Sequence, residues 1–65
     1  MCESSVVLER GGRRESLMAD VVHVEVNGEE IQLTAILGET KNVKGRIKEI
    51  NLMQHTIVIE ECNSS

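Results

Sequence analysis

Apolar and polar residues alternate along much of this chain, which is the period-two pattern of strands with one buried face. Glycines and short polar clusters divide the chain into segments of strand length. We expect strands at 4–10, 13–18, 21–26, 30–37, 40–51 and 56–61, with an offset at Ala19-Asp20 between the second and third. The predicted inward residues are Val22, Val24, Val26, Ile31, Leu33, Ala35, Leu37, Val43, Gly45, Ile47, Ile57 and Ile59.

Glycine positions predict the turns. Gly11-Gly12 and Asn27-Gly28 are two-residue hairpin signals, because such turns need positive φ. Gly38-Glu39 predicts another turn, and residues 51–55 the last one. Gly45 lies inside a strand pattern and predicts a bend that lets a small sheet curl, and the alternation breaks again near Glu49.

The composition agrees with an all-β fold. Val, Ile and Thr make up 17 of the 65 residues, and no proline interrupts the strands. We expect a single domain over residues 1–62 with a flexible tail at 63–65. The expected architecture is a small curled antiparallel meander or barrel of the Sm-like or SH3-like kind, since closure removes exposed edges.

Length limits the core that one copy can build. A chain of 65 residues buries only about 60% of its unfolded surface, and two cysteines cannot form a disulfide framework. Association is a usual remedy, so we expect a homodimer. The sequence shows no long apolar run and no secretory pattern, which predicts a cytoplasmic protein with reduced thiols.

Candidate chemistry begins at Met1-Cys2. The amine and amide nitrogens of this pair and the Cys2 sulfur can close two fused five-membered rings around one metal ion. If Met1 is removed, the new amine and the same sulfur still close one ring. Mixed nitrogen and sulfur donors in a plane suit nickel(II) or copper(II). The alternative is that Cys2 is only a small apolar residue at a chain end.

Three other donors have open roles. His23 is predicted on the outward side of a strand and His55 at a turn, where each is a surface residue or an auxiliary ligand. Cys62 follows the last apolar run. It is an idle thiol, an oxidation-prone partner of Cys2, or a second sulfur ligand, because first and last strands of a closed barrel are often neighbours.

Charge argues against most nucleic-acid binding. The formal net charge is −4, and the chain has no Phe, Tyr or Trp on which bases could stack. One strand face nevertheless carries three basic residues, Lys44, Arg46 and Lys48. They predict either an RNA-binding barrel, which is the alternative function, or simply a solvated strand face. No phosphate loop, paired-cysteine zinc motif or nucleophile elbow is present, and we do not expect an enzyme.

Two segments together resemble the CooT family of small nickel-binding proteins. These are MCESSVVL at 1–8 and VKGRIKEINL at 43–52, followed by His55. The resemblance implies a homodimeric β-barrel that binds Ni(II) through Cys2. It further implies a metallochaperone or nickel store in the maturation of a nickel enzyme such as carbon monoxide dehydrogenase. Two Cys2 thiolates, one from each subunit, would share one nickel ion with backbone nitrogens of Met1 and Cys2.

Overall fold

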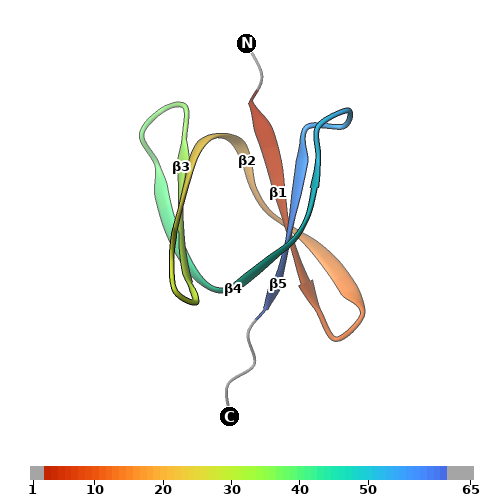
Figure 1. Ribbon diagram of the computed structural model, residues 1–65. Coiled ribbons are helices and arrows are strands. Elements are labelled where there is room, and N and C mark those ends of the chain that lie inside the picture. Colours follow the sequence, from red (N-terminus) through yellow and green to blue (C-terminus); the bar gives the residue numbers. More distant parts are fainter. Residues whose placement is uncertain (1–2, 62–65) are drawn as a thin grey trace.

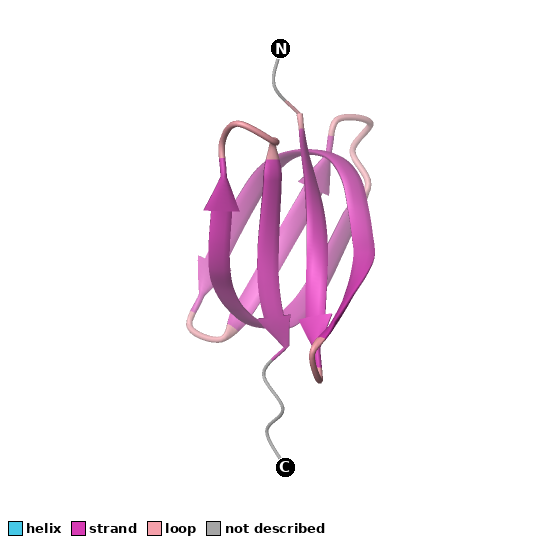
Figure 2. Ribbon diagram, turned by 90° about the vertical axis from the view of Figure 1, so that its right-hand side faces the viewer, coloured by secondary structure: helices cyan, strands magenta, loops and turns pink. Residues whose placement is uncertain are grey.

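The computed structural model describes residues 3–61, which form five strands. The strands are β1 (Ser4–Arg10), β2 (Arg13–Asn27), β3 (Glu30–Ala35), β4 (Thr40–Asn51) and β5 (Thr56–Glu61) (Figure 1). Figure 2 shows strands and loops only over this part of the chain, which confirms the predicted all-β class. None of these residues forms a helix that could cross a membrane. The predicted tail at 63–65 lies outside the described residues.

The strands close into a barrel in the order β1-β2-β3-β4-β5. Four neighbouring pairs are antiparallel, whereas β1 and β5 pair in parallel, with Ser5 opposite Thr56 and Glu9 opposite Glu60. The predicted antiparallel barrel is therefore confirmed, and its closing pair is the one parallel ladder among the described strands. The reason is the odd strand number: in an up-and-down chain the first and fifth strands run in the same direction.

Two long, bent strands connect the two halves of the barrel. β2 pairs with β1 up to Val21 and with β3 from Val21 to Asn27, and β4 pairs with β3 as far as Lys44 and with β5 from Gly45. The bend of β2 coincides with Asp20 at φ 58° and with shifts in register on either side of it. This confirms the predicted offset.

The bend of β4 depends on Gly45, as predicted. Gly45 is buried, and a Cβ atom there would overlap the carbonyl oxygen of Glu60 on β5. The missing side chain lets β4 approach β5 closely where β4 leaves β3. A register shift between Ile47 and Glu49 confirms the second irregularity expected in this strand.

The hairpin turns follow the glycines with one correction. Gly11 and Gly12 have φ of 57° and 81°, as a type I′ turn requires. At the next hairpin we expected Asn27-Gly28 at the centre, but Asn27 is the last residue of β2 and the turn residues are Gly28 and Glu29. Only Gly28 has positive φ, at 63°, which is the pattern of a type II′ turn.

The core lies inside the barrel and is aliphatic. Ile31, Leu33, Ala35 and Ile59 are buried as predicted, together with Val6, Leu8, Met18 and Val21. Three of the predicted inward residues are instead exposed, namely Val22, Val26 and Leu37. Leu37 lies beyond the end of β3, and the two valines lie where β2 no longer has β1 beside it.

Candidate metal centre

Met1 and Cys2, the predicted metal ligands, lie outside the described residues. The structure does describe the start of β1, two residues further along the chain. An extended chain spans at most about 3.6 Å per residue, so Cys2 is within about 7 Å of Ser4. The surroundings of Ser4 therefore define the part of the barrel that a metal held by Cys2 would meet.

Three segments surround the start of β1. The amide of Ser5 donates to the carbonyl oxygen of His55 at 2.8 Å, which ties β1 to the β4–β5 turn. Ser4 is paired with Val21 at the bend of β2, and the amide of Ile36 in the β3–β4 turn donates to Asp20 O at 2.8 Å. Figure 1 shows both turns and the bend of β2 at the end of the barrel where β1 begins.

Each of these three segments carries exposed apolar side chains. We call them the apolar rim: Val22, Ile36, Leu37, Leu52 and Met53. Leu37 is 93% exposed and Met53 is 91% exposed. Exposed apolar side chains at one end of a barrel make that end a candidate for contact with a partner. No sequence pattern indicated the rim, because its residues come from three separate segments.

Of the two histidines, His55 is the one bonded directly to the start of β1. Its carbonyl holds Ser5, and its backbone has φ of 51° at the end of the last turn. That turn is fixed by the amide of Gln54, which donates to Asn51 Oδ1 at 3.0 Å, and by Thr56 Oγ1, which donates to Gln54 O at 3.0 Å. The His55 side chain is exposed.

His23 is also on the surface, as predicted. Its Nε2 lies 3.6 Å from Glu25 Oε1 on the same strand, and both side chains are more than half exposed. Among residues 3–61, no three His, Cys, Asp or Glu side chains are grouped so that they could hold a metal ion. A metal site at this end would therefore need donors from the segment before Glu3, from a second copy, or from both.

Cys62 lies outside the described residues. Its predicted approach to Cys2 assumed that adjacent first and last strands bring the two chain ends together. The strands are adjacent but parallel, so Ser4 and Glu61 lie at opposite ends of the barrel. The length of β5 alone, five residue steps, spans about 17 Å. Strand order therefore gives no reason for the two thiols of one chain to meet.

Each member of the basic strand faces an acidic residue. Lys44 is opposite Glu30, and Arg46 is opposite Glu60. Lys48 donates to Glu9 Oε1 across β5. Opposite charges on neighbouring strands stabilise the sheet and reduce the positive potential that a phosphate track needs. The arrangement favours the solvated strand face over the RNA-binding alternative.

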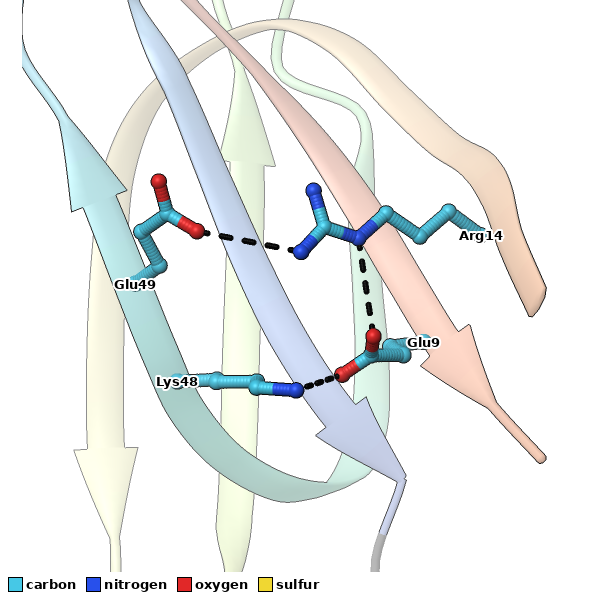
Figure 3. Close-up of polar contacts among 4 residues, drawn as sticks. All are labelled: Glu9, Arg14, Lys48 and Glu49. Carbon is cyan, nitrogen blue, oxygen red and sulfur yellow. Dashed lines mark hydrogen bonds and ion pairs between the residues drawn. The ribbon is translucent and has the colours of Figure 1, made fainter. Parts of the chain in front are cut away.

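Lys48 belongs to a cluster of four charged residues that the sequence did not predict (Figure 3). Arg14 Nε lies 3.6 Å from Glu9 Oε2, and its Nη2 lies 3.8 Å from Glu49 Oε1. The hydrogen bond from Lys48 lowers the pKa of the Glu9 carboxyl, and the same bond raises the pKa of Lys48. The cluster links β1, β2 and β4 across the outside of β5.

This cluster accounts for an unexpected buried residue. Val58 is 2% exposed although its neighbours Ile57 and Ile59 face the core, so Val58 points outward. It is paired with Val7 of β1 and with Glu49 of β4. The aliphatic stems of long charged side chains cover apolar surface in this way. The cluster therefore stabilises the barrel. Because Lys48 is paired with Glu9, it is not available to contact a phosphate.

The fold and its exposed features define a class: a small closed β-barrel with exposed apolar side chains on the segments around the start of its first strand. Comparison with known proteins gives the family. The family described as CO dehydrogenase accessory protein CooT matches residues 1–60, and this chain belongs to it. It is therefore an accessory protein and not itself an enzyme. This confirms the resemblance found in the sequence.

The chain is also similar to a solved structure and to two archaeal proteins. A crystal structure of a protein assigned as CooT from Carboxydothermus hydrogenoformans superposes with a TM-score of 0.86 at 29% identity, covering 95% of this chain and 100% of that one. An uncharacterised protein of Methanothermobacter thermautotrophicus is 40% identical over 60 residues, 92% of this chain and 89% of its own length. Another, from Archaeoglobus fulgidus, is 42% identical over 43 residues, 66% of this chain and 96% of its own length.

Proposed function

We propose that this protein binds nickel(II) through Cys2 and carries it, as a homodimer, to a nickel enzyme such as carbon monoxide dehydrogenase. The observation that supports this most directly is the position of the apolar rim. Cys2 is within about 7 Å of Ser4, and Ser4 lies among the segments that carry the rim. The metal would be cargo at a surface that a partner can reach.

The donor chemistry suits a carrier. A Cys2 thiolate with backbone nitrogens of Met1 and Cys2 offers a planar nitrogen and sulfur set, which nickel(II) accepts. The thiol and the amide must each lose a proton when the metal binds. Backbone and thiolate donors from one short segment also permit ligand exchange, which delivery requires and which a closed cage of side chains would oppose.

Two copies are part of the proposal for a chemical reason. The segment before Glu3 supplies one thiolate, and residues 3–61 offer no grouped set of metal-binding side chains to complete a site. A second Cys2 from a partner copy would supply the missing sulfur. The parallel pairing of β1 with β5 supports a second copy as the source, since it separates the two described chain ends.

Native mass spectrometry of reduced protein titrated with nickel(II) tests the proposal. We expect one nickel per dimer in the wild type, none in Cys2→Ser, and one in Cys62→Ser, which is the matched control for loss of a thiol. Equal nickel binding by the wild type and Cys2→Ser would refute Cys2 as the ligand. Loss of nickel in Cys62→Ser as well would contradict a site built only from the Cys2 segment.

A further inference from the structure

The strand β2 has an open edge. β1 lies along one side of β2 only as far as the pair of Ser4 and Val21, whereas β3 lies along the other side up to Asn27. Glu3 is not part of β1, and within residues 3–61 β2 packs against no strand other than β1 and β3. Residues 23–27 therefore present one side of their backbone to no other described strand.

The hairpin determines which backbone groups face this edge. Asn27 and Glu30 flank the two-residue turn and form its hydrogen-bonded pair. Hydrogen-bonded and non-bonded pairs alternate along an antiparallel ladder, so Glu25 directs its amide and carbonyl toward β3. Val24 and Val26 direct theirs toward the open edge. The amides and carbonyls of these two valines therefore have no strand partner among residues 3–61.

The open edge lacks the basic residues that guard the other free edges of the described strands. Those edges belong to residues 13–20 of β2, away from β1, and to residues 40–44 and 46–51 of β4, away from β3 and β5 in turn. Sheets use charged edge residues, lysine above all, to prevent another strand from pairing. Residues 22–26 carry no lysine, arginine or proline. The three guarded edges carry Arg13 and Arg14, Lys41 and Lys44, and Arg46 and Lys48.

Side chains along the open edge specify which strand can pair with it. Val26 is 53% exposed and Val24 is only partly buried against the core, so one face offers apolar surface at alternate positions. On the other face, the side chains of His23 and Glu25 are more than half exposed. No lysine or arginine of the described part of the chain pairs with Glu25. A complementary strand is apolar opposite the valines, basic opposite Glu25 and acidic opposite His23.

A second barrel does not fit this edge. Two-fold pairing centred on Val24 would place the partner's Asn27 opposite Val21, where β1 already begins. An axis nearer to Val21 meets the same obstacle. Pairing centred on Val26 would bring the turn at the partner's Gly28 opposite Val24. The edge therefore suits a short strand that is free to end before it reaches β1.

We propose that this edge binds a short extended segment of another protein by β-strand addition, antiparallel to β2. The segment lies opposite residues 27 to 23 in that order and ends there, because β1 begins beside Val21. Backbone bonds to Val24 and Val26 provide the affinity, and the alternating apolar and charged side chains provide the specificity. In the proposed carrier, the enzyme that accepts nickel would supply this segment, and that link alone rests on the proposed function.

A blocked peptide, acetyl-Thr-Val-Lys-Val-Glu-amide, tests the proposal with metal-free, reduced protein. We expect saturable chemical-shift changes and slower hydrogen exchange at the Val24 and Val26 amides, while the His23 and Glu25 amides, bonded to β3, stay protected throughout. The same peptide with both valines N-methylated keeps its side chains but loses the two donors that face β2, and it should not bind. No saturable change with the parent peptide, or equal binding of the N-methylated one, would overturn the proposal.

Hydrogen exchange without peptide tests the other possible occupants of the edge. We expect the Val24 and Val26 amides to exchange quickly at every protein concentration. Protection at every concentration would mean that the chain itself covers the edge, and protection that rises with concentration would mean that a second copy covers it. Either result would overturn the proposal.

A charge exchange tests the register. The peptide acetyl-Thr-Val-Glu-Val-Lys-amide has the same composition but places an acidic residue opposite Glu25 and a basic one opposite His23. It should bind the wild type about 2- to 30-fold more weakly than the parent peptide. In the double variant His23→Glu/Glu25→Lys the preference between the two peptides should reverse. An unchanged preference would overturn the antiparallel pairing.

A matched pair of substitutions tests the edge from the side of the protein. Val26→Pro removes an amide that faces the open edge, so no bond to β3 is lost, and peptide binding should disappear. Val26→Thr keeps the amide and the β-branched shape and should still bind the peptide. Equal binding by the two variants would contradict the proposal. These measurements use metal-free protein, so their failure is distinct from a failure of nickel binding in the Cys2→Ser titration.

Discussion

Gly45→Ala is the substitution that most directly tests how the barrel closes. Gly45 is buried, and its amide donates to the carbonyl oxygen of Glu29 at 2.8 Å. A new Cβ would overlap the carbonyl oxygen of Glu60 and lie 3.0 Å from Ile59 Cγ2. The obstacle is backbone of β5, which cannot rotate away as a side chain can. The two strands would have to separate where β4 bends.

Two effects of opposite sign set the magnitude. Forcing extra atoms into a packed site destabilises by about 1–3 kcal/mol. Replacing glycine by alanine also lowers the entropy of the unfolded chain, which stabilises by about 0.4–1 kcal/mol. The overlap should win by roughly 1–2 kcal/mol, and a domain of this size loses about 4–8 °C in Tm per kcal/mol. We expect Gly45→Ala to melt roughly 5–15 °C below the wild type.

Thermal melting followed by circular dichroism measures the change, with Ile59→Leu as the background control, because leucine lacks the Cγ2 atom and conserves the side-chain volume. If the overlap is with the β5 backbone, Gly45→Ala should lower Tm equally in wild-type and Ile59→Leu proteins. A smaller loss in the Ile59→Leu background would place the contact at the side chain instead. An unchanged or raised Tm in Gly45→Ala would refute the close approach of β4 to β5.

Three further predictions concern charge and metal. Glu9 has a lowered pKa because Lys48 stabilises its charged form, so this stabilisation is complete above pH 4.5 and disappears as pH falls through the folded-state pKa. Glu9→Gln should therefore show a shallower loss of Tm below pH 4.5 than the wild type, and an equal slope would contradict the ion cluster. Nickel affinity should be weaker near pH 5 than near pH 8, because binding releases protons, and a flat profile in calorimetry would argue against thiolate and amidate ligands. RNA should give no salt-dependent gel shift, since Lys44 and Arg46 face acidic residues; a shift abolished by neutralising Lys44, Arg46 and Lys48 together would restore the RNA-binding alternative.

Local features of the chain predicted most strand bounds. The strands at 4–10, 40–51 and 56–61 lie where alternation and glycine placed them, because both signals depend on near neighbours. The predicted turn at Asn27-Gly28 lies one residue before the observed turn at Gly28-Glu29. Asn27-Gly28 and Gly28-Glu29 both satisfy a two-residue turn, and strand register decides between type I′ and type II′.

Features that depend on distant residues were not predictable in this way. Val22 and Val26 alternate as buried residues do, but the end of β1 at Ser4 leaves them half exposed. Val58 looks like an outward residue, yet side chains from β1, β2 and β4 gather over its strand. The apolar rim likewise needs three separate segments to meet. The metal role of Cys2 stays a prediction from the sequence and from the family that the chain resembles.

The closing parallel pair links the fold to the proposed mechanism. With an even number of strands, the two chain ends would meet at one end of the barrel, and a single copy could offer two thiols to a metal. Five strands put Ser4 and Glu61 at opposite ends. In the proposed carrier, another copy is therefore the source of a second sulfur beside Cys2. The strand number therefore favours a dimer as the form of the proposed carrier.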